Sequence, residues 1–195
     1  MIQQQQVIHF FDRLAPQWDA DMIRNDEIIS MILDGAGVGA GQQILDVACG
    51  TGVLIGDYLN REVAHVTGID ISPEMVRIAR GKFSPAQVTI LEGAAETFAP
   101  EERYDVIMIY NAFPHFPDPD ALISHLSGLL KPGGRLSVAH GMSRAMIDRH
   151  HEGSASKVSL GLMHEDNLAA IFSRYLTVTL KRSDDRMYQV VGIKD

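Results

Sequence analysis

Short apolar runs alternate with helix-forming segments through much of the chain, and this alternation restricts the fold more than any other feature. The runs are rich in β-branched residues and end at polar or turn residues, which is typical of strands buried on both faces of a sheet. They are Ile44–Val47, Val63–Ile69, Val88–Leu91, Val106–Ile109 and Leu136–Ala139. Strand–helix alternation of this kind builds a parallel sheet through right-handed crossovers. We therefore expect an α/β fold with a doubly wound sheet.

The segments between the runs carry helix start signals. Ser72-Pro73-Glu74 offers an N-cap, a proline at the first helical position and an acid that faces the helix dipole. Asp118-Pro119-Asp120 repeats this order before a helical pattern over Ala121–Leu130. Pro132-Gly133-Gly134 is predicted to end that helix.

The last part of the chain predicts a different arrangement. Tyr175–Lys181 and Met187–Ile193 are β-rich runs separated by Ser183-Asp184-Asp185-Arg186, a sequence typical of an antiparallel hairpin. The expected architecture is therefore a single domain over residues 1–195, with a mostly parallel seven-stranded sheet whose last strand turns back. Residues 1–30 are expected to form N-terminal cover helices. Residues 141–164 form the longest connection, and such connections are often functional, so we expect substrate contact there.

Composition excludes several classes of protein. The formal net charge is −8 and no long lysine or arginine cluster occurs, which argues against nucleic acid and favours a small, neutral or cationic partner. The one cysteine, Cys49, cannot form an intramolecular disulfide, so a reducing compartment is expected. The first residues lack the pattern of a secretion signal, and no stretch approaches the roughly 20 apolar residues of a membrane span. These features predict a cytoplasmic protein that is a monomer or a homodimer.

A strand that runs into a glycine turn marks the expected ligand site. Ile44–Val47 leads to Gly50 and Gly52, and a helical pattern follows. In open parallel sheets, ligands bind at the carboxyl ends of the strands. Glycines let the backbone approach a ligand closely, and a helix N-terminus offers N–H groups to an anion. Glycine turns are shared by many nucleotide-binding folds, so this one alone does not identify the ligand.

An acidic residue at the end of the next strand narrows the choice of ligand. The next strand ends at Asp70, where a carboxylate can accept hydrogen bonds from both ribose hydroxyls of an adenosine ligand. The alternative is that Asp70 caps the following helix, but Ser72 is better placed for that role.

Together these segments resemble class I S-adenosylmethionine-dependent methyltransferases, especially those of ubiquinone and menaquinone biosynthesis. Leu45–Gly52 is similar to their first motif and Gly68–Met75 to their second. Leu91–Glu96 falls where the family places its adenine-contacting turn, Leu129–Leu136 resembles the lead-in to the fifth strand, and Phe10–Asp19 resembles an N-terminal cover segment. The resemblance implies a Rossmann-like fold, S-adenosylmethionine as cofactor and methyl transfer to a small-molecule acceptor.

The resemblance also implies the role of each matching residue. Asp46, Gly50 and Gly52 would surround the methionine half of the cofactor, and Asp70 would hold the ribose. Ala48, in the same turn, would also belong to the cofactor site. Ile71, Met75, Ala94, Ala95 and Glu96 would contact the adenine, and Asn111 would lie beside the sulfonium and the amino group. The chain departs from the family at Ala48, where glycine is commonest, and at Ala94, where an acid often reads the adenine amino group.

Histidines are the candidate acceptor-site residues. His115 follows the fourth strand and His140 ends the fifth, so both belong to the expected ligand edge, and either could remove a proton from the acceptor. His150, His151 and His164 lie in the segment after the fifth strand. A structural role is the alternative for each. The spacing of these histidines matches no compact metal motif, so no metal is expected, and a metal held by some of them stays the open alternative.

Two other functions remain open from the sequence. Gly50, Gly52 and Gly56 fit a dinucleotide loop of an NAD(P)-dependent oxidoreductase, although no tyrosine is followed by a lysine four residues later, as a short-chain dehydrogenase requires. A non-catalytic module that binds S-adenosylmethionine is the other alternative, because a fold does not fix a function.

Overall fold

A computed structural model of the chain describes residues 2–83, 86–151 and 157–195, except for the side chains of residues 148–151. The strands are β1 (Gln43–Val47), β2 (His65–Asp70), β3 (Val88–Glu92), β4 (Tyr104–Tyr110), β5 (Leu130–His140), β6 (Thr177–Ser183) and β7 (Tyr188–Ile193). The helices are α1 (Gln4–Asp21), α2 (Asp26–Ala36), α3 (Ile55–Asn60), α4 (Pro73–Lys82), α5 (Pro119–Gly128), α6 (Arg144–His151) and α7 (Glu165–Phe172), with short 3-10 helices η1 (Ala95–Thr97) and η2 (Phe113–His115).

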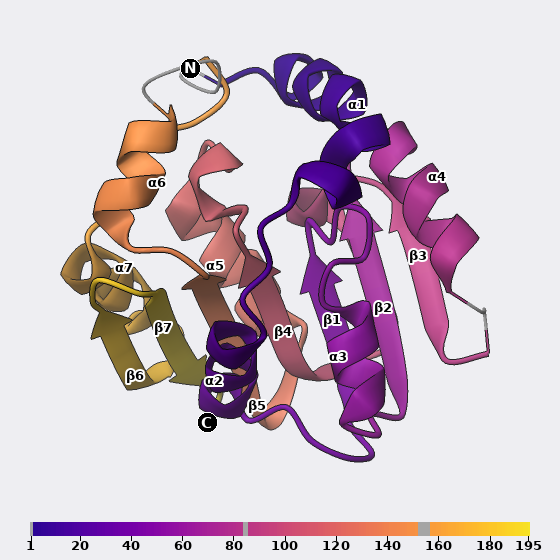
Figure 1. The fold of residues 1–195 in the computed structure, drawn as a ribbon. Helices are drawn as coiled ribbons and strands as arrows, with labels where there is room; N and C mark the ends of the chain where they lie inside the picture. The colour runs from indigo at the N-terminus through magenta and orange to yellow at the C-terminus, as the bar shows by residue number, and fades with distance from the viewer. Residues whose placement is uncertain (1, 84–85, 152–156) are drawn as a thin grey trace.

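All the strands form one sheet in the order β3-β2-β1-β4-β5-β7-β6 (Figure 1). β1 to β5 pair in parallel, whereas β7 is antiparallel to both of its neighbours. The expected seven-stranded, mostly parallel sheet with a C-terminal antiparallel hairpin is confirmed. The strand order reverses between β1 and β4, which is the place where open α/β sheets bind ligands.

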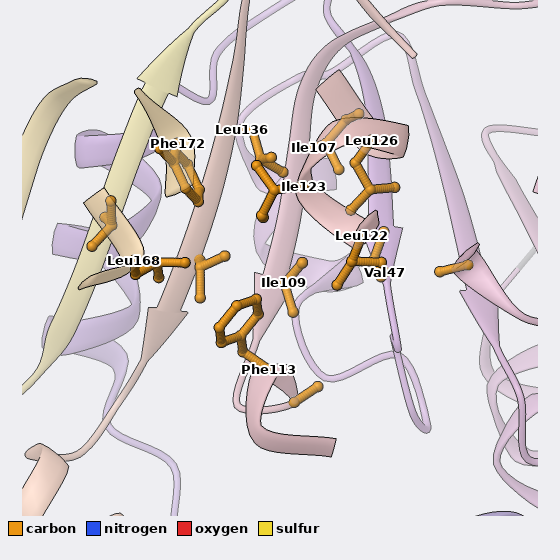
Figure 2. Close-up of a cluster of buried hydrophobic side chains, with 14 of the residues drawn as sticks. Val47, Ile107, Ile109, Phe113, Leu122, Ile123, Leu126, Leu136, Leu168 and Phe172 are labelled. Carbon is orange, nitrogen blue, oxygen red and sulfur yellow. The ribbon is translucent and has the colours of Figure 1, made fainter. Parts of the chain in front are cut away.

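Side chains of successive strand residues bury on opposite faces of the sheet. In β4, Val106 and Met108 pack with α2, α3 and α4, whereas Ile107 and Ile109 pack with α5 and α7. Figure 2 shows the second face, where Leu122 and Leu126 of α5 lie over β4. This two-residue alternation explains why the strands read as continuous apolar runs.

The predicted end of the helix that follows Asp118-Pro119-Asp120 was wrong. The helix expected over Ala121–Leu130 is α5, which ends at Gly128, and Pro132-Gly133-Gly134 lies within β5 instead of ending a helix. The pairing of β4 with β5 jumps from Leu130 to Arg135, so these turn residues bulge from the ladder. The helical pattern after the glycine turn becomes α3, which begins at Ile55.

The helix starts, by contrast, are as predicted. The Ser72 hydroxyl accepts a hydrogen bond from the Met75 N–H at 3.2 Å, and Pro73 opens α4. Asp118 caps α5 in the same way through the Ala121 N–H at 3.0 Å. In both α4 and α5, an N-cap residue followed by proline therefore sets where the helix begins.

The two N-terminal helices pack in different places. α2 buries Ile28, Ile29 and Ile32 against the sheet, whereas α1 lies beside α4 at the top of Figure 1. In the part of the chain that the structure describes, no helix is both long and apolar enough to cross a membrane.

Candidate active site

A cavity of about 810 Å³ lies between α1 and the carboxyl ends of the parallel strands. It is lined by the turns after β1, β2, β3 and β4, by the end of β5, and by α1. His115, His140 and all the predicted cofactor-binding residues line this cavity, except Gly52. The carboxyl ends of the parallel strands therefore bring together predicted residues from five separate segments of the chain.

The turn after β1 depends on left-handed backbone conformations. Ala48, Gly50 and Gly52 have φ values of 54°, 55° and 83°. A β-carbon on Gly50 would meet only the Met75 sulfur, at 3.9 Å, so the missing side chain leaves room at the cavity wall. Ala48 adopts a conformation that favours glycine, which explains why the family most often has glycine at that position.

Gly52 has a different role from the one expected. A β-carbon there would approach the Phe83 ring to 2.6 Å, and Gly52 does not line the cavity. The residue is needed for close packing behind the turn and for its positive φ. The structure therefore does not bring Gly52 to the predicted methionine subsite.

Asp70 ties the first two turns together. Its Oδ2 accepts a hydrogen bond from the Gly50 N–H and its Oδ1 accepts one from the Ser72 N–H, both at 2.8 Å. Burial raises the pKa of the Asp70 carboxyl, while these backbone donors oppose the rise. Because Ser72 is the N-cap of α4, Asp70 does not fill that role. A carboxylate has about four acceptor positions, so it can still accept hydrogen bonds from a ligand.

Asp46 is a second buried acid at the same edge. It is only 2% exposed, and burial, reinforced by the nearby Asp70 charge, raises its pKa to about 8. The Tyr58 hydroxyl is near enough to lower that pKa somewhat, although no hydrogen bond of standard geometry joins the two groups. Neither Asp46 nor Asp70 forms an ion pair with a described residue. Two buried carboxyls without a cation form a site suited to a positively charged ligand.

The turns after β2 and β3 form an apolar part of the wall. Ile71 and Met75 come from the turn after β2 and the start of α4, and Ala94, Ala95 and Glu96 come from the turn after β3. Met75 and Ala95 are buried, so this part of the wall is set by packing. The Ala94 position offers no carboxylate, and Glu96 is the acid of this turn that lines the cavity.

Asn111 closes the end of β4. Its φ is 54°, a left-handed conformation that asparagine tolerates well. Its Oδ1 accepts a hydrogen bond from the Gly141 N–H at 2.9 Å, which joins the ends of β4 and β5. Asn111 lines the cavity as expected, with its carbonyl oxygen engaged by the protein.

His115 lies in η2 and contacts α1. Its Nδ1 is 2.7 Å from the Val158 carbonyl oxygen, and its ring contacts Phe11 edge-on, with centroids 5.0 Å apart. A carbonyl only accepts, so Nδ1 carries the proton in the neutral ring and the lone pair resides on Nε2. This fixes the tautomer in which His115 meets the cavity.

His140 ends β5 and is 2% exposed. It lines the cavity, and its ring lies edge-on to Tyr188, with centroids 6.1 Å apart. His164 instead caps α7, and the side chains of His150 and His151 lie outside the described residues. Of the expected substrate segment, residues 152–156 also lie outside them. Within the described residues, no group of side chains has the arrangement of a metal site.

Sequence reasoning missed part of the cavity wall. Tyr110 and Phe116 line it, and neither stands in a recognisable motif. Met142 and Ile147 also line it, and they belong to the connection over residues 141–164 where substrate contact is expected. Sequence reasoning also missed the contacts that Asp12 and Asp19 of α1 make with the turns after β2 and β1. The only pointer to the second feature is the spacing of seven residues, which puts both aspartates on one face of a helix.

Comparisons with known proteins agree with this arrangement. A family described as "Methyltransferase domain" matches residues 44–134. The ubiquinone biosynthesis O-methyltransferase of Xylella fastidiosa (strain 9a5c) is 41% identical over 104 residues, a match that covers 51% of this chain and 42% of that protein. The same enzyme from Xanthomonas oryzae pv. oryzae (strain PXO99A) is 41% identical over 101 residues, covering 50% and 42%. The match thus spans less than half the length of these curated relatives.

Solved structures show the same fold over nearly the whole chain. The magnesium protoporphyrin IX methyltransferase of Synechocystis PCC 6803 superposes with a TM-score of 0.73 at 18% identity, covering 99% of this chain and 100% of that one. An S-adenosylmethionine-dependent methyltransferase from Mesorhizobium loti gives 0.70 at 15% identity, covering 94% and 100%.

The family match covers β1 to β4 and the turns after them, but not α1 or the end of β5, and the superpositions extend the fold to the hairpin. By sequence over residues 44–134 and by fold over nearly its whole length, the chain is similar to S-adenosylmethionine-dependent methyltransferases of class I.

Proposed function

We propose that this protein transfers a methyl group from S-adenosylmethionine to an uncharged or cationic small molecule. The observation that carries the proposal is the cavity itself, in which a glycine turn, two buried carboxyls and two histidines meet at the strand ends. The described residues that line it include Asp21, Asp46, Asp70 and Glu96 but no lysine or arginine. An acidic wall favours a cationic cofactor and disfavours a phosphate- or carboxylate-bearing acceptor.

The residues present fit this cofactor. When bound, S-adenosylmethionine supplies a methyl group on a positively charged sulfonium. Asp46 would hold the methionine half, where a cation relieves the cost of a buried carboxylate, and Asp70 would accept from the ribose. Ile71 and Met75 would pack against the adenine. Asn111 would face the methionine half and use the remaining hydrogen-bonding capacity of its side-chain amide.

The apolar remainder of the wall would receive the acceptor. Phe11, Trp18 and Phe116 line it together with His115 and His140. Aromatic walls orient a flat acceptor and exclude water, which is most of what an in-line displacement requires. Either histidine could take a proton from an acidic acceptor atom, and His115 would do so through Nε2. We also propose a cytoplasmic location, with the protein acting as a monomer or a homodimer.

Calorimetry followed by an acceptor screen tests the proposal. The purified protein should bind S-adenosylmethionine and S-adenosylhomocysteine and should not bind NAD or NADP. With labelled S-adenosylmethionine, label should pass to neutral aromatic acceptors in preference to matched carboxylate or phosphate derivatives. Tighter binding of a nicotinamide dinucleotide would refute the proposal. Cofactor binding without turnover on any acceptor class would favour the non-catalytic module.

A further inference from the structure

α1 presents two neighbouring stripes of side chains. The apolar stripe consists of Val7, Phe11, Leu14 and Trp18, and it lines the cavity. Asp12 and Asp19 follow members of this stripe by one position and are two helical turns apart, so they share an adjacent face. Neither aspartate lines the cavity. One stripe therefore covers the site, and the other is left to fasten the helix.

Asp19 binds the glycine turn after β1. The Thr51 hydroxyl, between Gly50 and Gly52, donates to Asp19 Oδ1 at 2.5 Å, and Lys82 Nζ of α4 donates to Oδ2 at 2.8 Å. The half-exposed ion pair with Lys82 contributes little by itself. Thr51 is fully buried, however, and without Asp19 its hydroxyl would have no acceptor among the described residues. Leaving a buried hydroxyl unpaired is costly, so this contact favours the docked helix.

Asp12 binds the turn after β2. The Ser72 hydroxyl donates to Asp12 Oδ1 at 2.6 Å, and the Glu74 N–H donates to the same oxygen at 3.2 Å. Ser72 is fully buried and begins α4, and it directly follows Ile71 of the cavity wall. Each of the first two turns at the cavity is thus joined to α1 by one carboxylate.

We infer that Asp12 and Asp19 are positioning residues that latch α1 across the cavity, so that the cofactor enters and its product leaves only when both contacts open. The inference rests on the proposed function, because it takes the two turns to be the cofactor turns. The latch acts through α1 and not through contact with the cofactor. Losing a hydrogen bond to a charged group from one turn should speed cofactor dissociation by about 10-fold.

Trp18 provides the reporter for a test. It is the one tryptophan of the chain, and it lies on α1 at the cavity wall. Dissociation of S-adenosylhomocysteine is followed by stopped-flow tryptophan fluorescence in the full-length protein. Thr51→Val removes the hydroxyl but keeps the shape, and Asp12→Ala removes the other contact without lowering helix propensity. Each should raise the dissociation rate about 10-fold, and the double variant should exceed both single variants.

Matched controls separate the latch from general disturbance. Thr51→Ser keeps the hydroxyl and should restore a rate close to that of the unmodified protein. Gln17→Ala changes an exposed residue of α1, and Asp26→Ala removes an exposed acid beyond it; both should leave the rate unchanged. Faster dissociation in Gln17→Ala or Asp26→Ala, equal to that in the latch variants, would overturn the inference.

A second measurement needs no cofactor. In the ligand-free protein, acrylamide should quench Trp18 more strongly in Thr51→Val and Asp12→Ala than in Thr51→Ser, because α1 opens more often. If S-adenosylhomocysteine binds normally but neither the dissociation rate nor the quenching changes, the latch alone is wrong. If the unmodified protein does not bind S-adenosylhomocysteine, the proposed function fails, and the role of the latch in cofactor exchange fails with it.

Discussion

Asp46→Asn should make the cofactor-free protein more stable while weakening cofactor binding. Burial raises the pKa of Asp46 from 3.8 to about 8, so the folded protein holds a proton that the unfolded chain has released over that pH range. The unfolded state binds fewer protons, and the free energy of unfolding therefore falls as the pH rises from about 4 to about 8. Each pH unit in this range costs about 1.4 kcal/mol, which amounts to about 4 kcal/mol at neutral pH.

Asparagine has nearly the shape of a protonated aspartate and does not titrate, so it avoids this cost. We expect Asp46→Asn to raise the free energy of unfolding by about 2–4 kcal/mol near pH 7 and to change it little below pH 4. Loss of the buried counter-charge should weaken S-adenosylmethionine binding by at least about 10-fold.

Urea denaturation of the cofactor-free protein at several pH values measures the first effect, and calorimetry measures the second. Asp26→Asn is the matched control, because that carboxyl is exposed and its removal changes the net charge equally. The reasoning is refuted if the stability of the unmodified protein does not fall between pH 5 and pH 8, or if Asp46→Asn is the less stable protein near pH 7.

Three further substitutions test other parts of the site. Ala48→Gly should raise the free energy of unfolding by about 0.5–1 kcal/mol, because it relieves a left-handed alanine; a lower melting temperature would show that the turn is not strained. Asp70→Ala should weaken S-adenosylhomocysteine binding in calorimetry by about 10- to 100-fold through the lost ribose contact, and an unchanged affinity would exclude Asp70 from that role. His140→Ala should leave cofactor affinity nearly unchanged and lower turnover by about 10²-fold, the usual scale for a lost general base; unaltered turnover would make His140 structural.

The strands and the place of the site could be predicted from the sequence because both follow from local patterns. Short apolar runs define the strands, and parallel strands bring their carboxyl ends to one edge. Asp46, Asp70 and Asn111 therefore reach the same cavity although they are far apart in the chain. The helix starts at Pro73 and Pro119 were equally predictable, since a cap acts within one turn.

What could not be predicted depends on contacts between distant segments. Gly52 packs against Phe83 instead of facing the cavity, and only the position of α4 decides that. The bulge in β5 follows from its pairing with β4, which no property of Pro132 reveals. The tautomer of His115 is set by the backbone carbonyl of Val158, 43 residues later in the chain. Because every residue has such a carbonyl, the identity of residue 158 does not predict this contact.

The position of β7 in the sheet has a consequence for how the chain folds as it is synthesised. β7 is the last strand in the sequence, yet it lies between β5 and β6. Its register with both neighbours runs over Tyr188–Ile193, and within the described residues β6 forms no ladder with another strand. On the ribosome, β6 therefore emerges without a partner, and the outer edge of β5 stays open until the last strand has left the exit tunnel. During that interval two strand edges can pair with another nascent chain. β6 has alternately exposed side chains and carries Lys181 and Arg182, and charged residues of this kind discourage such edge-to-edge association.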